Sequence, residues 1–132
     1  MSDPILPPSL ETIEALASAA FAEIPPELSR HVGAVVFRVE ELPDEETEAE
    51  MGLDSPFDLL GLYRGVAIPH KSGGGTPGDL DMIFLYRLPL LAYWCETGEP
   101  LLDIVRHVLV HEIGHHFGFS DDDMERLEED QP

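Results

Sequence analysis

The chain has 132 residues, 43% of them hydrophobic, so it can form one domain with a single core but not two. Twenty-seven acidic residues against seven basic ones give a formal net charge of −20, which disfavours nucleic acid and anionic membranes and favours divalent cations and basic peptides. Cys95 is the single cysteine, which excludes an intrachain disulfide and a thiolate zinc cluster. The sequence shows neither a signal peptide nor an apolar run near ~18 residues, and this predicts a cytoplasmic location.

The N-terminal part predicts a flexible arm, a helix and a strand. Residues 1–8 are rich in proline and form the arm, and residues 9–130 form the domain. Ser9 is a candidate N-cap, and apolar residues recur at helical spacing over 10–23, where the following prolines end the helix. Val and Phe dominate 32–42, which predicts a strand.

The middle of the chain alternates acidic, apolar and glycine-rich segments. Residues 43–56 are acidic and predict a solvated loop with at most one helical turn. Residues 57–68 begin as a turn and end as a strand, 69–80 form a glycine- and proline-rich loop, and 81–87 predict a third strand. We therefore expect an α+β fold with a small, mostly antiparallel sheet.

The C-terminal part predicts helices. Residues 88–98 form a short helix or a crossing segment. The segment 99–119 has Pro100 at a helix start, is apolar nearly all round, and ends at Gly118, so it is a central, buried helix. Residues 120–130 predict a short acidic helix.

The central helix carries the pattern His-Glu-x-x-His at His111, Glu112 and His115. A spacing of four residues rotates by ~400° about a helix, so both imidazoles lie on one face and can converge on one ion. Zinc accepts imidazole nitrogen at ~2.0–2.1 Å and lowers the pKa of water that it binds to ~7. Glu112 points beside the ion, where a carboxylate can act as general base.

A catalytic zinc site needs a third protein ligand, and three aspartates follow the helix. Gly118 can adopt a left-handed conformation that turns the chain back toward the metal. Asp121 then stands where the metzincin pattern has a histidine, and zinc accepts carboxylate oxygen at ~2.0–2.2 Å. Asp122 and Asp123 compete for this role, and all three aspartates also suit the N-terminus of the next helix.

Three further residues could support the ligands. His107 lies one turn before His111 and is either a hydrogen-bonding neighbour of the site or a satisfied core residue, the latter being favoured. Met124 is either a residue beneath the metal or, as we favour, a core residue of the last helix. Asp122 could hold a ligand if it does not bind the ion itself. His116 is rotated ~100° from His115 and should point away.

The residue that would stabilise an oxyanion cannot be chosen from the sequence. Tyr63, Arg64, His70 and Tyr86 are candidates by residue type alone. The strand Met82–Tyr86 could present an edge that pairs with an extended peptide.

The stretch "VLVHEIGHHFGFSDDDMERLE" resembles the small bacterial zincin-like metallopeptidases, also called minimal metalloproteases. The similarity extends upstream to "LLGLYRG" and "DMIFLYR" and covers most of residues 57–128. The resemblance implies a zincin-like α+β domain with a small sheet beside the active-site helix. It also implies metal ligands at His111, His115 and Asp121, with Glu112 as the base.

These features predict a zinc-dependent peptidase with one ion, although another divalent metal would fit the same ligands. The substrate would be a peptide or protein, with a basic one suiting the acidic surface. Two alternatives stay open: a non-enzymatic binding module stabilised by the metal, and a metal-dependent amidohydrolase acting on a non-peptide amide. The oligomeric state is open.

Overall fold

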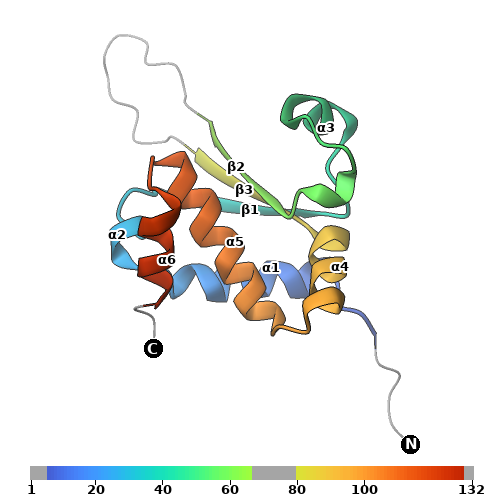
Figure 1. The fold of residues 1–132 in the computed structure, drawn as a ribbon, viewed down its shortest axis with the longest axis horizontal. Coiled ribbons are helices and arrows are strands. Elements are labelled where there is room, and N and C mark those ends of the chain that lie inside the picture. The colour runs from blue at the N-terminus through green and yellow to red at the C-terminus, as the bar shows by residue number, and fades with distance from the viewer. Residues whose placement is uncertain (1–5, 67–79, 130–132) are drawn as a thin grey trace, which may run out of the picture.

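The computed structural model describes residues 6–66 and 80–129 (Figure 1). The first five residues of the predicted arm, most of the predicted loop 69–80 and the last residues of the chain lie outside this range. In chain order the elements are α1 (Leu10–Ala22), α2 (Pro26–Ser29), β1 (Val35–Glu40), α3 (Glu45–Met51), the 3₁₀ turn η1 (Pro56–Asp58), β2 (Gly61–Val66), β3 (Leu80–Tyr86), α4 (Arg87–Thr97), α5 (Leu101–His116) and α6 (Asp121–Glu129).

The sheet has the strand order β1-β3-β2, with β1 parallel to β3 and β2 antiparallel to it. The α+β class is thus confirmed, but the sheet is mixed rather than mostly antiparallel. A parallel pair needs a long crossover, and the chain supplies one by placing α3, η1 and β2 between β1 and β3. The prediction that Met82–Tyr86 forms a free edge is wrong, because β3 is the central strand and buries Ile83 and Leu85 completely.

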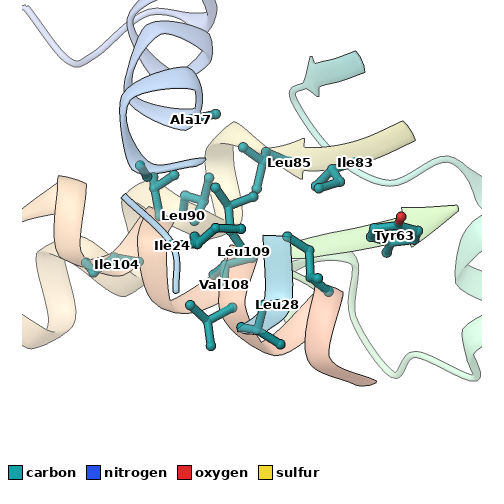
Figure 2. Packing of buried hydrophobic residues seen from close by; sticks show 14 of the residues in the cluster. Ala17, Ile24, Leu28, Tyr63, Ile83, Leu85, Leu90, Ile104, Val108 and Leu109 are labelled. Carbon is teal, nitrogen blue, oxygen red and sulfur yellow. The ribbon is translucent and has the colours of Figure 1, made fainter. Parts of the chain in front are cut away.

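Helices α1 and α5 contact each other and the sheet, α1 at β1 and α5 at β2 (Figure 1). Fully buried Ala17 and Ala20 let α1 approach closely. The core between these helices and the sheet is mostly aliphatic. Figure 2 shows Leu109 and Val108 of α5 among Leu28, Leu85 and Leu90. Burying such side chains contributes about 1.5–3 kcal/mol each. The predicted buried, central helix is confirmed as α5.

Capping side chains fix the starts of α1 and α3. Ser9 Oγ accepts from Thr12 N at 3.1 Å and begins α1, as predicted. In the acidic segment 43–56, Asp44 Oδ1 accepts from Thr47 N at 2.7 Å and Gly52 ends α3 at φ 63°. The predicted loop therefore holds a seven-residue helix, longer than one turn, because a capped start and a left-handed glycine offset the acidic repulsion.

Two ends of the domain can be described. Arg87 Nε donates to the Pro8 carbonyl at 2.7 Å, so the chain is held to β3 and α4 just before α1. Helix α6 packs on α5 near the C-terminal end of α5 (Figure 1).

In residues 6–66 and 80–129, no helix has both the length and the apolar character to cross a membrane.

Candidate metal centre

Helix α5 presents His111 and His115 one turn apart on its exposed side. The ring centroids are 5.9 Å apart and the rings are nearly perpendicular, at 83°. Burial, followed by the neighbouring His107, lowers the pKa of His111. A lowered pKa favours the neutral imidazole that a metal ion requires.

Gly118 makes the turn between α5 and α6, as predicted, with φ 84°. Phe119 N donates to the Gly114 carbonyl at 2.8 Å and closes the end of α5. A capping box then starts α6: Asp123 N donates to Ser120 Oγ at 3.0 Å, and Ser120 N donates to Asp123 Oδ2 at 3.2 Å. Two local motifs therefore fix the angle at which α6 returns along α5.

This turn brings Asp121 to the histidines. Asp121 Oδ1 lies 2.9 Å from His115 Nε2, and ligand atoms of His111, His115 and Asp121 all lie within 4.8 Å of one another. The hydrogen bond from His115 is the main cause that lowers the pKa of Asp121. Two imidazole nitrogens and one carboxylate oxygen at this spacing fit a tetrahedral zinc ion with one position open.

The other two aspartates have different surroundings. Asp123 serves the capping box and pairs with Arg126 at 2.7 Å. Asp122 is exposed and belongs to neither metal-ligating group of the described residues. Of the three candidates, Asp121 is the one that the turn presents to both histidines.

Glu112 lies on α5, which contacts β2, and the Tyr63 backbone on β2 is close enough to influence the pKa of its carboxylate. Strand β2 is an edge strand that pairs only with β3 among the described strands. Burial is the main cause that raises the pKa of Glu112, and the Tyr63 amide and His115 act in the opposite direction. The side chain is half-buried, beside the ligands rather than among them.

Gly114 and Met124 form the contact between α5 and α6 beneath the ligands. Met124 is fully buried, and a Cβ on Gly114 would overlap its sulfur and lie 2.8 Å from its Cγ. The interpretation of Met124 as a core residue is confirmed. The glycine inside the motif is the position that lets α6 approach.

His107 and His116 behave differently from each other. His116 turns away from the ligands, as predicted, and stacks on the Tyr63 ring with centroids 4.1 Å apart. His107 is 55% exposed, so its favoured interpretation as a core residue is wrong. Its Nδ1 lies 3.0 Å from Glu128 Oε2.

Glu128 is the residue near this centre that the sequence reasoning missed. Its second oxygen, Oε1, lies 3.2 Å from His111 Nε2. A usable signal was present, because Glu128 follows Asp121 by seven residues and a helix brings such a pair onto the same face.

The three described candidates for an oxyanion donor are either buried or paired with another residue. The Tyr63 ring packs on His116, and its hydroxyl is buried with no hydrogen-bond partner among the described residues. Burial is the main cause that raises the pKa of Tyr63. Arg64 pairs with Glu50 at 2.8 Å, Tyr86 is 2% exposed, and His70 lies outside the described residues.

Two open cavities run along this face of α5. The first, of about 450 Å³, is lined by the candidate ligands His111 and Asp121 and by other carboxylates of α6. The second, of about 310 Å³, shares His107 and Glu128 with the first and extends toward α4. Its apolar lining residues are Leu60, Tyr93, Ile104 and Val108. Its acidic lining residues include Glu99 and Asp103.

Comparison with known proteins identifies the family and supports the fold. The family model described as zincin-like metallopeptidase matches residues 32–131, and the chain belongs to this family. A solved structure described as a conserved hypothetical protein from Thermus thermophilus is 23% identical, with a TM-score of 0.54, over 83% of this chain and 94% of that one. At this identity the likeness shows the fold alone. No curated protein matches the chain.

Proposed function

We propose that the protein is a zinc-dependent peptidase in which His111, His115 and Asp121 hold the ion and Glu112 is the general base. The observation that carries the proposal is the return of α6, which sets Asp121 Oδ1 2.9 Å from His115 Nε2 while His111 lies within ligand range of both. Family membership points to the same class, a metallopeptidase with a divalent metal, typically zinc.

Each residue has a distinct part in the proposed reaction. A zinc ion held by these three residues would supply Lewis-acid chemistry for the attack of water on a peptide carbonyl. Glu112 is the residue that would take a proton from the attacking water and give it to the leaving amine. The Tyr63 backbone acts to lower the pKa of Glu112 and so favours the charged carboxylate, which is the form that can accept a proton.

The second cavity supports a basic peptide as the substrate. Its apolar residues suit the aliphatic stem of a Lys or Arg side chain, and Glu99 supplies a carboxylate for the charged end. Arg106, the cation that also lines it, pairs with Asp103 at 2.9 Å and lies 3.9 Å from Glu23. The net charge of −20 strengthens the attraction for a basic chain.

Metal content and hydrolysis of a lysine-containing peptide test the assignment in three variants. Glu112→Gln should keep zinc and lose about 10²–10⁴-fold in kcat, the usual contribution of a general base. Asp121→Asn should weaken zinc binding and lose hydrolysis together. Glu125 lies on the same helix as Asp121 and lines the same cavity. Glu125→Gln therefore serves as the matched control and should retain both zinc binding and hydrolysis. Hydrolysis by Glu112→Gln at the parent rate would overturn the proposed mechanism.

The substrate class has its own test. Glu99→Gln should raise KM for a lysine peptide and leave KM for its leucine counterpart unchanged. Glu14→Gln on α1 removes the same charge from a remote, exposed position and should change neither constant. If both variants raised KM for the lysine peptide equally, the overall charge of the protein would explain the effect. The assignment of the second cavity as the binding site for a basic side chain would then be refuted.

A further inference from the structure

A second cluster of metal-ligating atoms lies one helical turn before the first. It consists of His107, His111 and Glu128, whose ligand atoms all lie within 4.8 Å of one another. The two oxygens of Glu128 divide between the histidines, with Oε2 3.0 Å from His107 Nδ1 and Oε1 3.2 Å from His111 Nε2. The two imidazole rings lie 4.1 Å apart between centroids.

The two clusters contain the same ligand types. Each offers two imidazole nitrogens from α5 and one carboxylate from α6, a composition that suits zinc and other divalent ions of the first transition row. They arise from one arrangement, because α6 runs back along α5 and sets Asp121 against His115 and Glu128 against His107.

The clusters share His111, and this makes them alternatives. His111 Nε2 faces Glu128 Oε1, and a neutral imidazole nitrogen has one lone pair for a metal ion. Two ions therefore cannot both use that atom. An ion in the second cluster leaves His115 and Asp121 to pair with each other, as they do at 2.9 Å.

We propose that His107, His111 and Glu128 form an alternative divalent-cation site that competes with the peptidase site for His111. The proposal rests on the proposed function only in that His111 serves both sites. Glu112 is rotated about α5 by ~60° from His115 but by ~140° from His107, so an ion drawn toward His107 lies on the side of the helix away from the base. The alternative site thus holds the metal in a resting position and lowers the fraction of protein that is active.

Removing Asp121 should reveal the alternative site. The full-length protein is stripped of metal and titrated with zinc against a chromophoric chelator, comparing the parent, Asp121→Asn, Glu128→Gln and the double variant. Asp121→Asn should still bind one ion with His107, His111 and Glu128. Adding Glu128→Gln should weaken that binding at least tenfold, roughly the minimum cost of disturbing a ligand set. In the parent background, Glu128→Gln should leave zinc affinity equal or slightly lower, because one of the two alternative positions for the same ion is lost.

Imidazole nitrogen spectra supply a readout that does not depend on activity. Zinc should shift the His107 ring resonances in Asp121→Asn and leave them unshifted in Asp121→Asn/Glu128→Gln. The control Glu14→Gln, which removes the same charge from an exposed position on α1, should match the parent in every titration and so separates ligand loss from general charge removal. Circular dichroism of each variant checks that the fold is retained.

The outcomes separate this proposal from the proposed function. A parent that binds no zinc overturns both. If the parent binds one ion, and Asp121→Asn binds zinc as tightly as the double variant does, only the alternative site is overturned. Retained zinc and retained hydrolysis in Asp121→Asn overturn the peptidase ligand set and also the resting role of the alternative site, whereas retained zinc with lost hydrolysis supports both proposals.

Discussion

The contact between Gly114 and Met124 yields a prediction whose magnitude can be worked from the structure. In Gly114→Ala, the new Cβ would overlap Met124 Sδ and meet Cγ at 2.8 Å, closer than real Cβ contacts allow. Met124 is 0% exposed, so its side chain cannot move out into solvent. Either its rotamer changes within the core or α6 shifts away from α5, and α6 carries Asp121.

Two terms of opposite sign set the stability of this variant. Replacing glycine by alanine inside a helix gains about 1 kcal/mol in helix propensity. Overpacking a well-filled core costs about 1–3 kcal/mol. The net loss is therefore small, up to about 2 kcal/mol, and the single variant alone is a weak test.

A double-mutant cycle with Met124→Ala isolates the packing term. Met124→Ala costs about 2–5 kcal/mol by itself but removes the atoms that the new Cβ would meet. In that background Gly114→Ala should be stabilising by about 1 kcal/mol, since only helix propensity remains. The propensity term is common to both backgrounds and cancels, so the coupling energy should equal the overpacking cost of about 1–3 kcal/mol.

Urea unfolding of the four metal-free proteins measures the cycle, and zinc titration of the same samples reports on Asp121. Gly114→Ala should bind zinc at least tenfold more weakly than the parent, roughly the effect of misplacing a ligand. A coupling energy near zero, or a Gly114→Ala protein with the zinc affinity of the parent, would refute the reasoning that this glycine sets the approach of α6.

Three further predictions follow from single contacts. Ser120→Ala should cost about 1 kcal/mol in urea unfolding through loss of the α6 cap, whereas Ser18→Ala on the exposed side of α1 should stay within about 0.5 kcal/mol of the parent. His116→Ala should lose about 0.5–1.5 kcal/mol of stacking on Tyr63 and leave zinc affinity unchanged, while His115→Ala should lower zinc affinity sharply; equal effects on zinc would contradict the division of roles. The Thr47 backbone amide lowers the pKa of Asp44, so the stabilisation from this cap should be present above the unfolded pKa of aspartate and be lost as pH falls through the folded pKa. Urea unfolding of the parent and Asp44→Ala should therefore converge at low pH, and a gap that widens there would reverse the assigned sign.

The parts of the site that could be predicted from the sequence are those fixed by local geometry. Helical phase alone separates His111 and His115 from His116, and Gly118 signals the turn that makes Asp121 reachable. Each of these relations spans a few residues, where the backbone has few alternatives.

The features that were missed depend on contacts between distant segments. Apolar patterning marked β3 as a strand, but its central place follows from pairing with β1 and β2, which local patterning does not encode. The influence of the Tyr63 backbone on the pKa of Glu112 depends on the packing of β2 against α5 and could not be read from either segment alone. Glu128 is an intermediate case, because its spacing from Asp121 was visible while the direction of α6 was not.

The three proposed ligands come from one helix–turn–helix segment, α5 to α6, and this has a consequence for the denatured state. A short, flexible chain segment keeps its donors near one another, so the unfolded protein should retain measurable affinity for zinc. Binding to the unfolded chain subtracts from the stabilisation that mass action would otherwise give. Zinc should therefore raise the unfolding midpoint by less than its affinity for the native protein implies. Its clearest effect should be slower hydrogen exchange in α6, with little change in the sheet.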